Sequence, residues 1–126
     1  MKRVIFIICL VLSFCGCAQK PSLVSYNPAE FEKLIREDAD IQLVDVRRPD
    51  EYAAGHLDKA ILINVLDSGF VTQAELLLDK SKPVAVYCRS GKRSKDAAEK
   101  LSGRGFKVYE LNSGYNGWVD YQKSKE

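Results

Sequence analysis

Short apolar runs recur along the chain and predict the strands of a single sheet. The runs 41–46 (IQLVDV), 61–65 (ILINV), 84–88 (VAVYC) and 107–111 (KVYEL) have the length of buried strands, and 23–26 (LVSY) suits an edge strand. The run VAVYC has no polar alternation, which is typical of a strand covered on both faces. We therefore expect a sheet with helices packed on both of its sides.

Amphipathic segments between these runs predict helices. Asn27, Pro28 and Glu30 have the residue types of an N-cap, a first helical position and a capping box, so a helix is expected to begin there. The remaining helical segments are a single turn stopped by Gly55, and residues 73–78, 94–102 and 114–123. Strands that alternate with helices predict a mainly parallel α/β sheet, in which ligands bind beyond the carboxyl ends of the strands.

The first residues have the pattern of an export signal. Lys2 and Arg3 precede an uncharged run over 4–18, which is short for a membrane span and suits a secretory signal. Gly16 before Cys17 resembles the lipobox of bacterial lipoproteins, although the two residues before Gly16 depart from the usual pattern. We predict a signal peptide at 1–16, a lipidated Cys17 with a polar linker over 17–22, and one domain over 23–126.

Removal of this signal changes the charge and the number of thiols. The full chain has 19 Lys and Arg against 17 Asp and Glu, and the loss of Lys2 and Arg3 leaves 17 of each. Nucleic-acid binding loses support, because it depends on surplus positive charge. Of the four cysteines, two leave with the signal and Cys17 is acylated, so Cys88 is the one free thiol. Such a thiol is a candidate reactive group, and a zinc site of several thiolates is excluded.

Cys88 lies between a predicted strand and a predicted helix, in the segment CRSGKRS. A thiol at such a turn faces backbone N–H groups and the positive end of the helix, which stabilise a thiolate. Arg89, Lys92 and Arg93 add positive charge that is unfavourable at a helix N-terminus. We expect this charge to favour an anionic sulfur and an anionic donor, the alternative being a solvated cluster. Gly91 is expected to adopt a backbone conformation that a side chain would forbid.

Three blocks of sequence carry a family resemblance. LVDVRRPDEYAAGHLDKAILINV, VYCRSGKRS and LNSGYNGW, in this order and spacing, closely resemble a rhodanese-homology domain, the sulfurtransferase module, over roughly residues 23–123. One departure is Ser113, which replaces the first glycine of the usual Gly-Gly pair. The resemblance implies a five-stranded central sheet flanked by helices, and transfer of a sulfane sulfur through a Cys88 persulfide. The loop that would form the cradle for the anion comprises Arg89, Ser90, Gly91, Lys92, Arg93 and Ser94.

Several other residues have a structural and a functional interpretation. His56 is the only histidine and suggests a Cys–His pair, but in GHL it resembles the structural histidine of the family. Asp45 and Arg47 end a predicted strand and should lie near Cys88, where we expect them to brace the loop rather than to react. Trp118 is expected to have a packing role, the alternative being a wall of the substrate site.

Other classes of function remain open. The related dual-specificity phosphatases have five residues between cysteine and arginine, whereas four separate Cys88 from Arg93, which suits a sulfur atom better than a phosphoryl group. A non-catalytic binding module of the cell envelope typically lacks the cysteine. A thiol-redox protein would need a partner thiol. The favoured interpretation is a single-domain sulfurtransferase.

The resemblance and the predicted lipid also fix the expected partners and location. The substrates would be a thiosulfate-like anion and a thiol or cyanide-like acceptor, which could be carried by an unidentified protein, and no metal or organic cofactor is implied. Ala18 after Cys17 is unlike the aspartate that retains lipoproteins at the inner membrane. We therefore expect a lipoprotein of the bacterial envelope that faces the periplasm, at the outer membrane where one exists.

Overall fold

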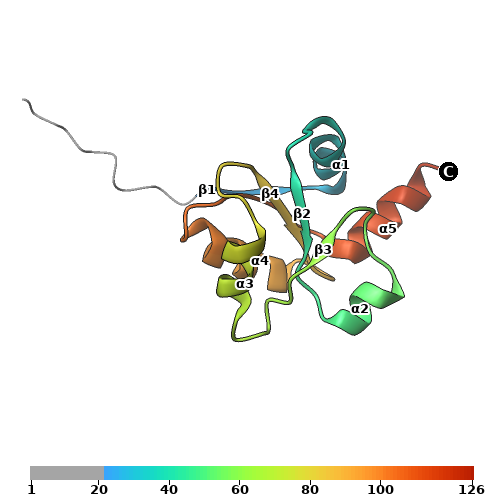
Figure 1. The fold of residues 1–126 in the computed structure, drawn as a ribbon. Helices are drawn as coiled ribbons and strands as arrows, with labels where there is room; N and C mark the ends of the chain where they lie inside the picture. Colours follow the sequence, from blue (N-terminus) through green and yellow to red (C-terminus); the bar gives the residue numbers. More distant parts are fainter. Residues whose placement is uncertain (1–21) are drawn as a thin grey trace, which may run out of the picture.

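The computed structural model describes residues 22–126, so the predicted signal and Cys17 lie outside the described residues. Its five strands form one sheet in the order β1-β5-β4-β2-β3, in which every pair is parallel. The strands are β1 (Ser22–Tyr26), β2 (Gln42–Asp45), β3 (Ile61–Leu62), β4 (Val84–Tyr87) and β5 (Lys107–Leu111). The predicted five-stranded parallel α/β fold is confirmed, and β1 is an edge strand (Figure 1).

Helices cover both faces of this sheet (Figure 1). They are α1 (Pro28–Glu37), α2 (Pro49–Ala54), α3 (Phe70–Leu77), α4 (Lys92–Ser102) and α5 (Gly114–Ser124). On one face, α3 and α4 pack against Val44, Val86 and Val108. On the other face, side chains of α1, α2 and α5 pack around Leu43, Ala85 and Tyr87. The strand β4 is buried on both faces, as the unbroken apolar run predicts.

The element boundaries agree with the sequence at α1 and differ at β3, α3 and α4, with α3 beginning at Phe70 rather than at the expected residue 73. Asn27 and Glu30 form the predicted capping box, with bonds of 2.8 and 2.9 Å between backbone N–H and side-chain oxygen. The strand β3 is shorter than the predicted 61–65, because a turn begins at Asn64, whose side-chain oxygen accepts the N–H of Leu66 at 3.0 Å. The helix α4 begins two residues before the predicted Ser94, because Gly91 is its N-cap.

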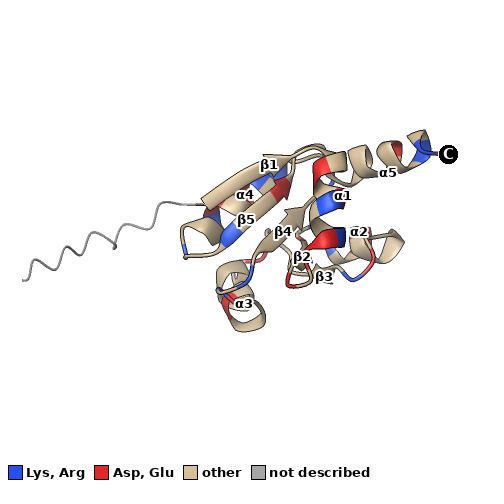
Figure 2. Cartoon of the chain, turned by 90° about the horizontal axis from the view of Figure 1, so that it is seen from above, with Lys and Arg blue, Asp and Glu red and all other residues tan. Residues whose placement is uncertain are grey.

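The parallel arrangement brings the carboxyl ends of all five strands to the same side of the sheet, called here its carboxyl edge. Cys88 directly follows β4 at this edge, between the ends of β2 and β5. In the view of Figure 2, Lys and Arg are interspersed with Asp and Glu along the chain. None of the helices within residues 22–126 has the length and apolarity needed to cross a membrane.

Candidate active site around Cys88

The sulfur of Cys88 lies beneath the loop that joins β4 to α4. The residue is only 1% exposed, and its Sγ accepts the backbone N–H of Gly91 at 3.0 Å. The thiol also faces the hydroxyl of Ser94, with 3.5 Å between Sγ and Oγ. The first-turn N–H groups of α4 have no partners within the helix and give this end a partial positive charge. The backbone of the loop therefore favours a negative charge on sulfur, as an oxyanion hole favours one on oxygen.

Two glycines allow the loop to fold this tightly. Gly91 has a φ of 105°, and a Cβ at this position would lie 2.2 Å from the carbonyl oxygen of Asn112. Gly114 has a φ of 66°, and a Cβ there would lie 2.4 Å from the carbonyl oxygen of Arg89. Both contacts involve backbone atoms, which cannot move aside as a flexible side chain can. The conformation expected for Gly91 is thus present, and the N-terminus of α5 closes on the loop.

The first turn of α5 fixes the loop by donating backbone N–H groups to two of its carbonyls. The N–H of Tyr115 donates to the carbonyl of Cys88 at 2.7 Å, and the N–H of Asn116 donates to that of Arg89 at 3.0 Å. These bonds hold the carbonyls of the loop on the side of α5. The sulfur of Cys88 is therefore positioned by two helix N-termini, those of α4 and α5.

The three cations of the loop have different surroundings. Arg93 forms a bidentate salt bridge with Glu51 of α2, with N–O distances of 2.7 and 2.9 Å. The bond from Arg93 lowers the pKa of Glu51 to about 2, and the bond to Glu51 raises the pKa of Arg93, to which the charge of Cys88 contributes less. Arg89 and Lys92 are exposed. Much of the charge of Arg93 is thus compensated by Glu51.

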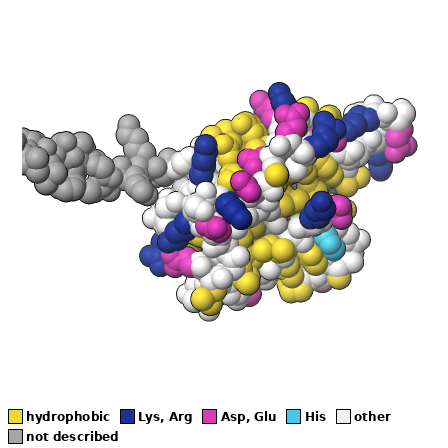
Figure 3. All heavy atoms as spheres, turned by 45° about the horizontal axis from the view of Figure 1, so that its top comes forward, with side chains coloured by type: hydrophobic (Ala, Val, Ile, Leu, Met, Phe, Trp, Pro, Cys, Tyr) yellow, Lys and Arg dark blue, Asp and Glu magenta, His cyan; other side chains and the backbone are white. Residues whose placement is uncertain are grey.

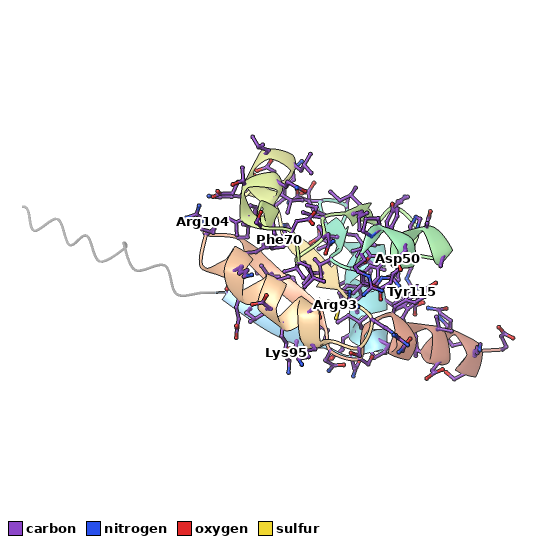
Figure 4. All side chains as sticks on the ribbon, turned by 90° about the horizontal axis from the view of Figure 1, so that it is seen from below. Asp50, Phe70, Arg93, Lys95, Arg104 and Tyr115 are labelled. Carbon is purple, nitrogen blue, oxygen red and sulfur yellow. The ribbon has the colours of Figure 1, made fainter. Side chains whose placement is uncertain are left out.

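A small pocket of about 220 Å³ adjoins the loop. It is lined by Arg47, Arg48, Glu51, Ala54, Gly55, Arg89, Tyr115 and Asn116. Figure 4 shows Arg93 of α4, Tyr115 of α5 and Asp50 of α2 near one another at this end of the sheet, with Arg104 at the other end. A larger pocket of about 590 Å³ is lined by Tyr26 and by residues of α1 and the turn after it, and Cys88 lines neither of these two pockets. The pocket beside the loop thus presents the exposed cations Arg48 and Arg89 beside the carboxylate of Glu51, while Arg47 is already paired with Asp45.

Asp45 and Arg47 form a buried ion pair at the same edge, at 2.7 Å. The carboxylate of Asp45 also accepts the hydroxyl of Tyr87 at 2.8 Å, while the guanidinium of Arg47 donates to the carbonyl of Gly55 at 2.6 Å. Burial is the largest single influence and opposes the charge of Arg47, but the bond to Asp45 and the charges of its neighbours together outweigh it, so the pKa of Arg47 is raised. The guanidinium lies 4.5 Å from the ring centre of Tyr115. This contact links the pair to the residue that holds the carbonyl of Cys88.

His56 and Trp118 lie outside the loop. His56 is exposed, stacks on Tyr52 with 3.7 Å between ring centres, and faces the carbonyl of Tyr52 at 2.8 Å (its side chain is cyan in Figure 3). Trp118 packs against Phe31 in the apolar cluster below α1 and α5. Among residues 22–126, no three His, Cys, Asp or Glu side chains gather as a metal site.

A buried carboxylate that the sequence analysis did not single out lies behind Ser94. Glu110 of β5 has an exposed fraction of 0%, and its Oε2 accepts the hydroxyl of Ser94 at 2.9 Å. Its Oε1 accepts the hydroxyl of Ser25 at 2.6 Å. A signal was present in KVYEL, where Glu110 is in phase with Val108 on a strand that has neighbours on both sides. A charged residue at a core-facing position of an interior strand indicates a buried polar group.

Comparisons with known proteins agree with this geometry. The profile of the family described as Rhodanese-like domain matches residues 27–121. The chain is 32% identical to the putative sulfurtransferase YtwF of Bacillus subtilis, over 79% of this chain and 93% of that protein. It is 36% identical to the thiosulfate sulfurtransferase GlpE of Coxiella burnetii, over 69% of this chain and 79% of that protein.

Other relatives extend the range of activities and supply solved structures. A tRNA uridine(34) hydroxylase of Pelagibacter ubique is 33% identical over 79% of this chain, which corresponds to 33% of that protein. A crystal structure of a rhodanese-related protein from Thermoplasma volcanium has a TM-score of 0.67 at 28% identity, over 78% of this chain and 92% of that one. Fold, sequence and the matched span agree: the chain belongs to the rhodanese-like family.

Proposed function

We propose that the protein is a sulfurtransferase in which Cys88 carries the sulfur as a persulfide. The observation that carries this proposal is the bond of 3.0 Å from the N–H of Gly91 to Sγ, in a strand-to-helix loop fixed by two helix N-termini. An N–H donor and a positive helix end stabilise a thiolate, and equally a persulfide anion, through the whole cycle. The relatives named sulfurtransferases support the same class of reaction.

The pocket beside the loop suggests how a donor such as thiosulfate is bound. Arg48 and Arg89 are exposed and line the pocket, so they can attract a dianion and neutralise it as it approaches. The thiolate of Cys88 attacks the outer sulfur of the donor, the S–S bond of the donor breaks, and sulfite leaves with the bonding electrons. The product is a persulfide anion on Cys88. An acceptor nucleophile then takes the outer sulfur and returns the thiolate.

Two features favour sulfur transfer over phosphate chemistry and over simple binding. Four residues separate Cys88 from Arg93, and the guanidinium of Arg93 is already held by Glu51 at two points. A phosphoryl group would need that guanidinium for its equatorial oxygens. A binding module has no need of a thiol aligned with an N–H donor and a hydroxyl at the carboxyl edge of the sheet.

We also propose that this domain is tethered to a bacterial envelope membrane through Cys17. Support comes from Lys2 and Arg3, the apolar run that follows them, and Gly16 before Cys17. Because β1 begins at Ser22, a lipid on Cys17 would leave only a short linker before the first strand. That strand starts at the amino edge of the sheet, so the tether and the Cys88 loop would lie at opposite edges.

The decisive experiment tests for the persulfide directly. The full chain with Cys9→Ser, Cys15→Ser and Cys17→Ser is treated with thiosulfate, and its intact mass is measured before and after cyanide. We expect the added mass of one sulfur atom, its removal by cyanide with release of thiocyanate, and neither change after the further substitution Cys88→Ser. An unmodified mass in folded, reduced protein would refute the proposal. If that protein also captured a partner protein without transferring sulfur to it, the binding module would be favoured.

A further inference from the structure

The buried carboxylate of Glu110 is joined to the sulfur of Cys88 by a single hydroxyl. Ser94 Oγ lies 2.9 Å from Oε2 of Glu110 and 3.5 Å from Sγ of Cys88. All three residues are buried, with exposed fractions of 0 to 1%. An isolated carboxylate at this depth would be costly, and here hydroxyls of Ser94 and Ser25 are its hydrogen-bond partners rather than a cation. The placement therefore calls for an explanation beyond packing.

The hydroxyl of Ser94 has only one hydrogen to donate. While Cys88 is a thiol, Ser94 donates to the Glu110 carboxylate or to the carbonyl of Gly91, at 3.1 Å, and accepts from the thiol. Once Cys88 is a thiolate, the hydroxyl of Ser94 donates its hydrogen to the sulfur. A protonated Glu110 would then donate a hydrogen bond to the oxygen of Ser94. The contacts thus form a relay through Ser94, along which Cys88 and Glu110 can exchange one proton.

We propose that Glu110 stores the proton that leaves Cys88, with Ser94 as the relay, and so acts as a positioning residue for the thiolate. The S–H bond of Cys88 breaks with the electron pair left on sulfur, and its proton goes to Ser94 Oγ. The hydrogen of Ser94 moves to Oε2 of Glu110 in the same step. Cys88 becomes a thiolate, Glu110 becomes a neutral carboxylic acid, and Ser94 is unchanged.

The charged groups around the relay are mostly paired with one another. From α2 and α4, the ion pair of Glu51 and Arg93 lies on the sulfur side, while Lys92 and Lys95 of α4 are exposed. The β1 strand presents the neutral Ser25 to Glu110, and the pair Asp45–Arg47 with Tyr87 lies beyond β4. The buried site thus holds one negative charge before and after the exchange, which avoids the cost of burying two. The exchange moves that charge toward the arginines.

The relay rests on the proposed role of Cys88. It is compatible with the proton balance of the sulfur transfer. Attack of the thiolate on the donor gives a persulfide anion and sulfite, and transfer to the acceptor restores the thiolate. No proton is taken up or released in either step. Glu110 can therefore remain protonated throughout, which keeps a second negative charge away from the incoming dianion.

The relay is testable from the titration of the thiol, which two coupled groups give in two macroscopic steps. The ultraviolet absorbance of the thiolate is followed against pH in the full chain, with Cys88→Ser subtracted so that the other cysteines cancel. We expect a first rise at acidic pH to a plateau, and a second rise at alkaline pH. Glu110→Gln, which keeps the shape and the bond from Ser25 and is neutral like the protonated acid, should keep one rise at acidic pH and lose the alkaline rise. Glu99→Gln, an exposed carboxylate of α4, is the matched control and should keep both.

A spectroscopic readout separates proton storage from a structural role. Infrared difference spectra at neutral pH should show the carbonyl band of a protonated carboxylic acid in the parent chain, which disappears with Cys88→Ser and with Glu110→Gln. Ser94→Ala should shrink the acidic step, and Ser94→Thr should restore it. A single-step titration in the parent chain together with no such band would overturn the relay, even if Glu110→Gln proved unfoldable. A two-step titration in a chain that forms no persulfide would instead leave the relay standing and remove the proposed sulfur transfer.

Discussion

The salt bridge between Glu51 and Arg93 couples the stability of the domain to pH through one identifiable carboxylate. The two side chains are 13% and 21% exposed, and Arg93 lowers the pKa of Glu51 from 4.5 to about 2. Each pKa unit corresponds to about 1.4 kcal/mol, so ionised Glu51 contributes at most about 3.5 kcal/mol to the free energy of unfolding. Glu51→Gln keeps an oxygen for the N–H of Arg48 and for Arg93, and we expect it to cost about 2 kcal/mol at neutral pH.

The sign of the pH dependence follows from the lowered pKa. Because the folded state holds Glu51 ionised more strongly than the unfolded state, its contribution is complete above pH 4.5 and is lost as the pH falls toward about 2. Urea unfolding of the parent chain and of Glu51→Gln should therefore differ at neutral pH and converge in acid. The matched control is Asp50→Asn, in the same helix, whose carboxylate is 71% exposed and pairs with exposed Arg48.

The control should change the urea midpoint little, because exposed ion pairs contribute little. A double-mutant cycle of Glu51→Gln with Arg93→Ala should show a coupling energy of about 1 to 3 kcal/mol, as expected for residues in direct contact. The reasoning is wrong if Glu51→Gln and Asp50→Asn have the same small effect at every pH. That result would mean that the bidentate contact is screened like any surface pair.

Four further outcomes are expected. Cys17→Ser should abolish fatty-acid labelling of the full chain, and equal labelling of the variant would contradict the lipoprotein proposal. One glycine inserted after Lys92 should weaken sulfur transfer in the cyanide assay, whereas the parent chain should transfer sulfur faster than it hydrolyses aryl phosphates. Tyr87→Phe should lower the free energy of unfolding by about 1 to 3 kcal/mol, because it leaves the carboxylate of Asp45 short of a buried donor; an unchanged urea midpoint would argue against that bond. Gly91→Ala should destabilise the domain and slow persulfide formation, since its Cβ would lie 2.2 Å from a backbone oxygen, and normal kinetics in this variant would show that the loop can shift.

Local signals in the sequence predicted the elements whose boundaries depend on neighbouring residues. The capping box at Asn27 and the run before Cys88 are such signals, and both lie where the sequence places them. The start of α4 was missed by two residues because Gly91, rather than a polar side chain, occupies the N-cap. The strand β3 was overestimated because an apolar run does not show that the side chain of Asn64 turns the backbone.

Long-range pairings at the site could not be read from the chain. Arg93 and Glu51 are 42 residues apart, and nothing in either segment specifies the other as its partner. The sequence therefore assigned the charge of Arg93 to the sulfur, whereas the structure divides it between the sulfur and a carboxylate. Glu110 was detectable as a buried residue from its phase on β5, but its connection to Cys88 depends on the turn of α4 that places Ser94 between them.

The charges around Cys88 are arranged in layers. On the solvent side lie Arg48 and Arg89 in the pocket, and on the core side lies the carboxylate of Glu110. With the proton on the thiol, the negative charge of the site is on Glu110, which accepts the hydroxyls of Ser94 and Ser25. With the proton on Glu110, the charge is on the sulfur, next to the N–H of Gly91. On the proposed relay, the arginines that attract the donor also favour the proton position in which the sulfur can attack. On the proposed function, a dianion bound in the pocket would partly neutralise those arginines, and the thiolate would gain reactivity as its stabilising charge is shared with the substrate.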